Sequence, residues 1–536
     1  MPTPGTPTPY SYILIRLLFR FVLKIFYGSI VVEGTNNIPK TGRPCIVCAN
    51  HSNSLTDALL LVTSIPPKDR NMLRLTAKAT QFGHRTFTSW LIESAGTVPI
   101  RRKKDYADGS ADNTQVMEKL METLELGDAI CLFPEGMSRY HPTIAPLKTG
   151  VARIISDVLT RNRNNPDFEI SLLNCSVTYM HRQHFRSDVL VTFHPPMTFS
   201  PKTHPELLDA SGTNYDAIRS LTAQMHDQIS SGTIDSPSWD LVRVGKLAAR
   251  IYAPLGTRMT LGDHVRVVRA FLEAFKAAED NHDVDGDHHE EEKTPAEAAE
   301  FAQLRLDLMT YGDQLARWGI KDDRIRRRTL PRYIILSRML VRFTWALCLF
   351  SISLPGLVLW IPVFLTTFYA VHNFKKSGPI FDTWDEIAQY KLIYGLMSGL
   401  AVWFGVSIVT FPFTVLTFLL VPALMWMTLR WLEDAVSAFR AFTALVRLLL
   451  VGKPTLRSMH ERREGLHARV MRLAVQTLGL PDDPESYFAR HGGREKGRVR
   501  GRWESGARYF SIKRRRKRDW NETLRLYDIV DYPKEE

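Results

Sequence analysis

Two long stretches without a charged side chain constrain this chain more than any other feature. The first runs from Phe343 to Val371, 29 residues, and the second from Leu392 to Leu429, 38 residues. A helix needs about 20 apolar residues to cross the hydrocarbon core of a bilayer, so a helix buried in a soluble protein is a poor explanation for either stretch. We therefore predict that the chain is held in a membrane.

The second stretch is too long for one ordinary span. As a single helix it would extend roughly 57 Å, against a hydrocarbon core of about 30 Å. It is either a tight hairpin broken near Pro412, or one span with an interfacial or re-entrant part. In the first stretch, Pro355, Gly356 and Pro362 are natural kink points.

Flanking charge predicts the orientation of these segments. Six arginines between residues 326 and 342 precede the first stretch, and a basic tail that includes Lys513–Arg518 follows the second. Positively charged flanks stay in the cytoplasm, so both large soluble parts should share that side, which requires an even number of crossings. We predict two crossings, with the loop Lys375–Lys391 between them and part of the second stretch not spanning.

The N-terminal segment has a different pattern. Residues 10–32 are mostly apolar, but Arg16, Arg20 and Lys24 recur every four residues and so share one helical face. This predicts an amphipathic, membrane-associated helix within residues 1–33, with the cations toward lipid phosphates. The residues expected in lipid are Leu18, Val22 and Phe26. A membrane span is the alternative interpretation.

Composition excludes some classes and leaves others open. The chain of 536 residues is 45% hydrophobic and 23% charged, which excludes fibrous and wholly disordered proteins. Its net charge of +13 indicates an anionic partner: a membrane, a phosphorylated substrate or nucleic acid.

Five cysteines form no disulfide framework, and the C-x-x-C pair Cys45 and Cys48 is interpreted as part of a strand core. The acidic stretch 279–293 reads as a disordered loop, and its calcium-loop spacing is a weak match.

The residues that could carry chemistry lie in the first 200 positions. A buried strand over residues 43–49 ends in Asn50 and His51, and Asp57 follows at the start of an apolar helix. From there a carboxylate can hold the imidazole in one tautomer. A structural histidine remains the alternative, since the chain has 16 histidines.

Further blocks follow in order. Residues 95–102 contain Gly96 and the pair Arg101 and Arg102, which suit a phosphate or a solvated strand end. A second buried strand, residues 129–133, breaks into a Pro-Glu-Gly turn that holds the remaining candidates. These are Glu135, Gly136, Ser138 and Arg139, followed by Lys148 at the start of a helix. The fourth block is a strand, residues 177–180, followed by Val189–Met197, which contains Pro195 and Pro196.

Together these blocks resemble the membrane glycerolipid acyltransferase superfamily, and within it the fungal-type glycerol-3-phosphate/dihydroxyacetone-phosphate sn-1 acyltransferases. The motif resemblance covers about residues 40–200. It implies an α/β acyltransferase domain, a mixed sheet flanked by helices, followed by C-terminal transmembrane helices. It also implies acyl-CoA as co-substrate, glycerol 3-phosphate or dihydroxyacetone phosphate as acceptor, no metal or other cofactor, and the endoplasmic reticulum membrane with the catalytic domain and tail cytosolic.

The resemblance assigns roles to the candidates. His51 is the general base, oriented by Asp57, and Gly96 contributes amides to an oxyanion site. The predicted substrate-binding set is Asn50, Gly96, Arg101, Arg102, Glu135, Gly136, Ser138, Arg139 and Lys148. Five residues separate His51 from Asp57 where the commoner pattern has four, and Ser138 stands where it has arginine. These departures favour the fungal-type branch and leave open whether Arg101, Arg102 or Arg139 grips the phosphate.

The predicted division of the chain follows. Residues 1–33 are the N-terminal helix, 34–235 the acyltransferase domain, 236–342 a helical cytosolic region, 343–431 the transmembrane part (343–371 and 392–430) and 432–536 the basic tail. The alternatives are a lysophosphatidate acyltransferase, a non-enzymatic membrane scaffold and a nucleic-acid binder. The last lacks any zinc or helix-turn-helix signature, and the tail's charge already fits the orientation rule. A hydrolase would need a G-x-S-x-G turn, which is absent.

Overall fold

The computed structural model describes residues 5–101, 114–208, 214–254, 257, 259–283, 295–326, 331–379 and 383–491. Arg102, most of the acidic stretch 279–293 and the basic tail with Lys513–Arg518 lie outside these residues. The described chain forms two compact units. Unit 1 contains residues 5–233 together with Ser377–Leu392, and unit 2 contains residues 234–376 and 393–491.

Unit 1 is built on a mixed sheet of eight strands in its described residues, in the order β1-β7-β6-β2-β5-β3-β4, with β8 paired to β6. In chain order the strands are β1 (Ser29–Glu33), β2 (Cys45–Ala49), β3 (Arg74–Lys78), β4 (Val98–Ile100), β5 (Ala129–Leu132), β6 (Ile170–Tyr179), β7 (Asp188–Phe193) and β8 (Met197–Phe199). Strands β2, β3, β4 and β5 are parallel along one half of the sheet, and β6 is parallel to β2. Strand β7 is antiparallel to β6. This is the mixed sheet that the sequence predicted.

The central strands are buried because they are continuously apolar. Strands β2 and β5 are buried along their whole length, and so is β6. Such runs suit parallel strands that helices cover on both faces. Ile46 pairs with Ile130 of β5, and Ala49 pairs with Cys175 of β6, so the three strands run in step. Their carboxyl ends therefore meet at one edge, where α/β proteins bind ligands.

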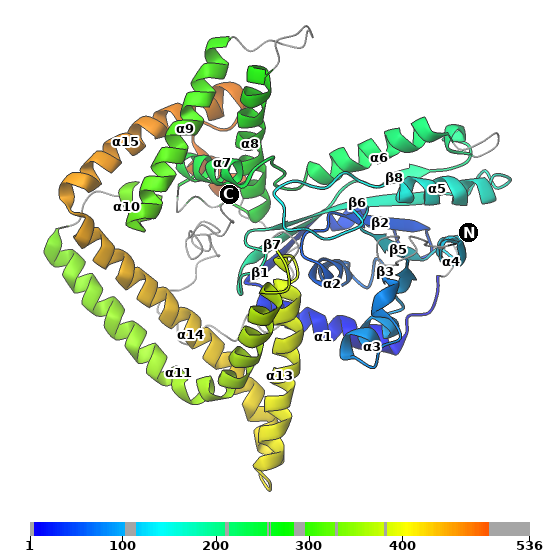
Figure 1. Ribbon diagram of the computed structural model, residues 1–536, viewed down its shortest axis with the longest axis horizontal. Coiled ribbons are helices and arrows are strands. Elements are labelled where there is room, and N and C mark those ends of the chain that lie inside the picture. Colours follow the sequence, from blue (N-terminus) through cyan, green and yellow to red (C-terminus); the bar gives the residue numbers. More distant parts are fainter. Residues whose placement is uncertain are drawn as a thin grey trace. The chain divides into compact units, whose positions relative to one another are not determined.

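Helices cover both faces of this sheet (Figure 1). They are α1 (Tyr10–Phe26), α2 (Leu55–Ser64) and α3 (Phe87–Ser94) on one face, and α4 (Thr114–Glu125), α5 (Gly150–Arg161) and α6 (Tyr215–Ser230) on the other. Residues of α4, α5 and α6 share a hydrophobic core with β2 and β5. Cys45 and Cys48 are buried and unbridged, as core residues of β2. Each face of the sheet thus has its own hydrophobic layer.

Helix α1 does not present the face that the sequence predicted to lipid. Val22 and Phe26, expected in the membrane, are buried in the protein. Arg16 is also buried, and its guanidinium donates to the carbonyl groups of Ile65 and Asn71, just beyond the end of α2. That position is favourable for a cation because carbonyl dipoles converge there. The apolar residues that α1 exposes are Tyr10, Ile13, Leu14, Leu17 and Phe21.

The predicted division of the chain differs from the structure in one further respect. Residues 377–392 fall in the middle of the predicted transmembrane region, yet they pack within unit 1. Lys391 donates through Nζ to the carbonyl of Gln183, 2.6 Å away. Trp384 lies edge-on to Tyr140, with ring centroids 5.3 Å apart. The acyltransferase unit is therefore assembled from two separate parts of the chain.

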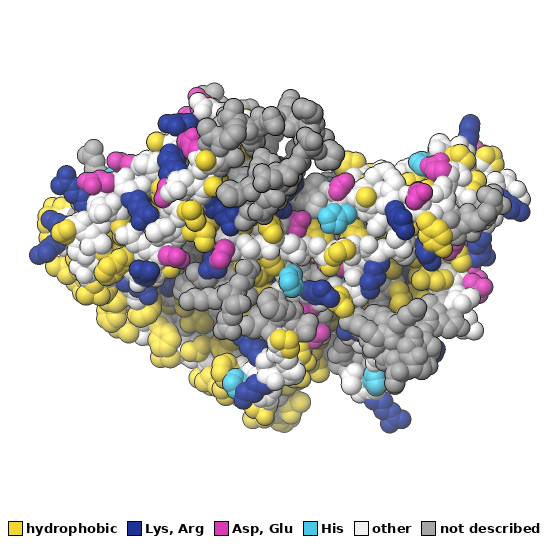
Figure 2. Space-filling view, turned by 45° about the horizontal axis from the view of Figure 1, so that its top comes forward, with side chains coloured by type: hydrophobic (Ala, Val, Ile, Leu, Met, Phe, Trp, Pro, Cys, Tyr) yellow, Lys and Arg dark blue, Asp and Glu magenta, His cyan; other side chains and the backbone are white. Residues whose placement is uncertain are grey.

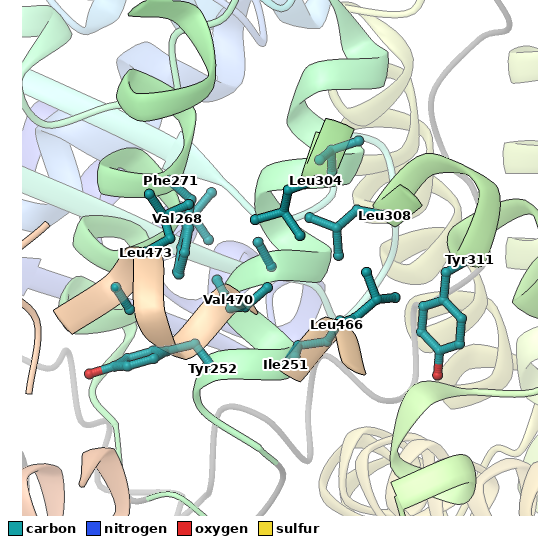
Figure 3. Close-up of a cluster of buried hydrophobic side chains, with 14 of the residues drawn as sticks. Ile251, Tyr252, Val268, Phe271, Leu304, Leu308, Tyr311, Leu466, Val470 and Leu473 are labelled. Atoms are coloured by element: carbon teal, nitrogen blue, oxygen red, sulfur yellow. The ribbon is translucent and has the colours of Figure 1, made fainter. Parts of the chain in front are cut away.

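Unit 2 is helical. Its helices outside the apolar stretches are α7 (Trp239–Tyr252), α8 (Leu261–Asp283), α9 (Pro295–Trp318), α10 (Asp322–Arg326), α15 (Lys453–Arg472) and α16 (Pro484–His491). Helices α7, α8, α9 and α15 share one core, which includes Ile251, Phe271, Leu308 and Val470 (Figure 3). The helical region before the membrane stretches and the chain after them thus fold together.

Within the described residues, three helices are long and apolar enough to cross a membrane: α11 (Arg332–Lys375), α13 (Ile387–Val409) and α14 (Thr414–Val451). The second uncharged stretch is broken between Val409 and Thr414, at Pro412, as the hairpin interpretation predicted. Trp403 donates through Nε1 to the carbonyl of Phe418, 2.8 Å away, across that hairpin. Apolar side chains gather on the surface along these helices (Figure 2). The number of crossings stays a prediction.

Candidate active site

His51 and Asp57 meet at the carboxyl edge of the sheet. Strand β2 ends at Ala49, so His51 lies just beyond it, and Asp57 occupies the first turn of α2. His51 Nδ1 is 3.0 Å from Asp57 Oδ2. A carboxylate accepts here, so Nδ1 carries the proton and Nε2 keeps its lone pair. In the described part of the chain no group hydrogen-bonds to Nε2, which leaves that nitrogen available as a base.

Asp57 is held by more than the histidine. Its Oδ2 accepts from the backbone amides of Ser52 (2.9 Å) and Asn53 (2.8 Å), and its Oδ1 accepts from the Tyr179 hydroxyl at the end of β6. Asp57 is fully buried. Burial, and then the charge of Asp57, raise the pKa of Tyr179 well above its ordinary value, so the hydroxyl remains a donor. These contacts fix the carboxylate that orients the imidazole.

The Pro-Glu-Gly turn after β5 positions His51 from the other side. Glu135 accepts from the His51 backbone amide through Oε1 (2.6 Å) and from the Ala145 amide through Oε2 (3.1 Å). Phe133 stacks on the imidazole, with centroids 4.1 Å apart. Burial raises the pKa of Glu135, although the two amides act in the opposite direction. The structure thus shows Glu135 positioning the His51 backbone, and its contact with substrate stays a prediction.

A glycine is needed at position 136 because the Lys148 side chain lies against it. Its φ of +75° is in the left-handed region, and a Cβ at this position would come within 2.3 Å of Lys148 Nζ. The backbone amide of Lys148 donates to the carbonyl of Pro134, 2.8 Å away. The start of α5 is thereby tied to the turn. Among the described residues no carboxylate forms an ion pair with Lys148, so its ammonium group is a candidate for binding an anion.

Ser138 and Arg139 follow each other in the turn but have different surroundings. Ser138 Oγ accepts from the Ser54 amide, 3.0 Å away, so the serine that replaces the usual arginine ties the turn after β5 to the start of α2. Arg139 is exposed and donates to the sulfur of Met137. Its carbonyl accepts from Arg182, a residue beyond β6 that the sequence analysis did not consider.

Asn50 and Gly96 have structural roles. The Asn50 amide pairs with both backbone groups of Val177 in β6, at 2.8 and 3.0 Å, which leaves it little capacity for a substrate. Gly96 has a φ of +69° just after α3, and Thr97 donates back to Ile92, so Gly96 terminates that helix. These contacts explain why both residues are present, and they do not involve the His51 imidazole.

The arginine block lies farther along the same edge. Arg101 follows β4, which is three strand positions from β2, or about 14 Å at the usual strand spacing. Arg101 is exposed. Of the three candidate arginines, Arg101 is thus at the sheet edge, Arg139 is exposed beyond the turn, and Arg102 lies outside the described residues.

Comparisons with known proteins agree with this architecture. Residues 29–171 match the family "Acyltransferase", and residues 244–481 match "Glycerol-3-phosphate acyltransferase 2 C-terminal domain". An uncharacterized acyltransferase of Schizosaccharomyces pombe is 25% identical, over 87% of this chain and 82% of that protein. Glycerol-3-phosphate O-acyltransferases 2 and 1 of Saccharomyces cerevisiae are 21% and 23% identical, over 71% and 53% of this chain.

The chain spans 62% and 36% of the lengths of those two Saccharomyces enzymes. The crystal structure of the 1-acyl-sn-glycerophosphate (LPA) acyltransferase PlsC from Thermotoga maritima aligns with a TM-score of 0.29 at 18% identity, over 41% of this chain and 80% of that one.

The fold, the two domain matches and the His–Asp pair define the class: the protein is an acyltransferase with long apolar C-terminal helices. More particularly, it combines an acyltransferase domain with a C-terminal domain of the glycerol-3-phosphate acyltransferase 2 type, and it is a homologue of the yeast glycerol-3-phosphate O-acyltransferases. The resemblance drawn from the motif blocks is thus confirmed.

Proposed function

We propose that the protein transfers an acyl group from acyl-CoA to the sn-1 hydroxyl of glycerol 3-phosphate, with dihydroxyacetone phosphate as a second acceptor. The product from glycerol 3-phosphate is lysophosphatidate. The observation that carries the proposal is the His51–Asp57 pair, 3.0 Å apart, at the ligand-binding edge of the sheet.

The chemistry follows from that pair. The hydroxyl proton moves to His51 Nε2 as the oxygen attacks the thioester carbon, and Asp57 stabilises the imidazolium that forms. The C–S bond then breaks, and the proton passes to the departing CoA thiolate. The bond made is an ester and the bond lost is a thioester, so the reaction requires no redox partner.

The acceptor phosphate needs cations near this pair. We assign Lys148 to it, because its ammonium group lies against Gly136 in the turn that also holds the His51 backbone. Arg139 and Arg101 would contribute from farther away. Residence in the endoplasmic reticulum, with the catalytic unit facing the cytosol, accompanies this proposal.

Purified protein with labelled acyl-CoA tests the assignment. The acceptors are glycerol 3-phosphate, dihydroxyacetone phosphate and lysophosphatidate, and His51→Ala should lower turnover by at least about a hundredfold because the base is lost. Membrane association of that variant should be unchanged. Turnover on lysophosphatidate alone would indicate the other branch of the superfamily, and full turnover by His51→Ala would exclude His51 as the base.

A further inference from the structure

The chain between two of the apolar helices forms part of the active-site wall. We call residues Thr383–Lys391 the interhelical segment; from Ile387 onward it includes the first residues of α13. Gln389 Oε1 accepts from the Ser54 hydroxyl (3.0 Å) and from the Leu55 amide (3.3 Å) at the start of α2. Ser54 has a φ of +46°, which is strained for a residue with a side chain, and Gln389 holds it there. The segment therefore supports the same turn that carries His51 and Asp57.

Asp385 is the carboxylate that this segment brings to the site. It is 3% exposed, and the Ser138 side chain hydrogen-bonds to it. Ser138 in turn accepts from Ser54, so a continuous set of contacts joins Asp385 to the start of α2. The other carboxylate oxygen, Oδ1, is buried without a hydrogen-bond partner in the described chain. Such an atom is costly to bury unless a ligand satisfies it.

The surrounding charges indicate what kind of ligand group fits. Burial raises the pKa of Asp385, while the hydrogen bond with Ser138 and then the charge of His51 act in the opposite direction. Asp57 already occupies His51 Nδ1, which leaves Asp385 without a role in orienting the imidazole. A carboxylate repels a phosphate, so Asp385 belongs at the hydroxyl end of the acceptor rather than at its phosphate end.

We propose that Asp385 binds the C2 hydroxyl of glycerol 3-phosphate while the C1 hydroxyl meets His51 Nε2. This inference rests on the proposed function. The two hydroxyls are on adjacent carbons, so a group close to His51 can reach the second one. The C2 hydroxyl donates a hydrogen bond, whereas the C2 carbonyl of dihydroxyacetone phosphate cannot. Asp385 thus favours glycerol 3-phosphate over the ketone.

The test compares glycerol 3-phosphate with 3-hydroxypropyl phosphate, which lacks only the C2 hydroxyl. The wild-type kcat/KM should favour glycerol 3-phosphate by about 10- to 100-fold, and Asp385→Ala should reduce that preference to about threefold or less. Turnover of 3-hydroxypropyl phosphate by Asp385→Ala should stay close to wild type, which shows an intact site. Glu386→Gln removes the neighbouring carboxylate and should keep the wild-type preference.

Three outcomes contradict the proposal. The first is a wild-type preference retained by Asp385→Ala. The second is the same loss on both substrates in Asp385→Ala and in Asp385→Asn, which keeps the size of the side chain and indicates a structural role. The third is a preference lost equally in Glu386→Gln, which indicates general electrostatics. A wild type inactive on every glycerol phosphate would instead overturn the proposed function.

Discussion

At the scale of single residues, the candidate site depends on contacts between groups far apart in sequence. The sequence predicted the pairing of His51 with Asp57 because Asp57 follows His51 by six positions, with a strand before and a helix after. It did not single out Tyr179, which is 122 residues from Asp57 and identified only by its place at the end of a strand. Glu135 was recognised, but its role depends on an amide of another loop.

The contact between Gly136 and Lys148 leads to a prediction about how the phosphate of the acceptor is bound. Lys148→Ala should raise KM for glycerol 3-phosphate about tenfold or more, because a cation for the phosphate is lost. Gly136→Ala should have a similar effect, since its Cβ displaces the ammonium group. Steady-state kinetics on both variants checks this, with Gly150→Ala as the control because a Cβ there meets nothing within 4 Å. An unchanged KM in Lys148→Ala would contradict the phosphate assignment.

At the scale of elements, apolar runs predicted the central strands and the uncharged helices well. Strands β2 and β5 lie where continuous apolar stretches indicated them, because burial on both faces leaves a clear pattern. The short strands β4 and β8 leave no such pattern in three residues each. Helix α11 extends beyond its uncharged core at both ends, since arginine and lysine are compatible with helix.

A buried ion pair joins elements of unit 2 that are distant in sequence. Arg463 of α15 donates through Nε to Asp322 of α10, 2.8 Å away, and the Tyr311 hydroxyl of α9 donates to the same carboxylate oxygen. Arg463→Ala should destabilise the protein by about 3–5 kcal/mol, because it leaves a buried carboxylate without its cation. Thermal unfolding in detergent would show a lower Tm.

The control for that variant lies on the same helix. Arg457→Ala breaks an exposed pair with Glu461, and its Tm should match wild type. Equal Tm values for Arg463→Ala and wild type would show that the buried pair contributes nothing to stability.

At the scale of the whole molecule, sequence order did not predict which segments fold together. The interhelical segment lies within residues 244–481, the C-terminal family match, but packs in the acyltransferase unit. Composition did not predict this packing, because a short segment between two apolar stretches has the same composition whether or not it packs against another unit. The rule that positively charged flanks stay in the cytoplasm assigns such a loop a side of the membrane but no packing partner. The contacts of Trp384, Gln389 and Lys391 show its position.

The packing of the interhelical segment in unit 1 predicts that this segment lies on the same side of the membrane as the catalytic unit. Ser377→Cys, on a Cys348→Ser background, should react with an impermeant maleimide in sealed microsomes from the same side as Arg219→Cys on α6. Both positions are exposed, and the other four cysteines are buried. Labelling of Ser377→Cys only after the membrane is permeabilised, with Arg219→Cys labelled before, would contradict this.

The packing of that segment in unit 1 also leads to a prediction about which helices cross the bilayer. We predict that both ends of α11 lie on the catalytic side, because residues 377–392 pack in unit 1 and the described residues between unit 1 and α11 include no helix of membrane-spanning length and hydropathy. Helix α15 shares a core with α7 and α9, so we expect α14 to end on that side as well. On this prediction, the part of the described chain that reaches the opposite leaflet is the hairpin of α13 and α14. The enzyme would then take up its acyl donor, bind its acceptor and release its product in a single leaflet, and moving that product across the bilayer would be left to other proteins.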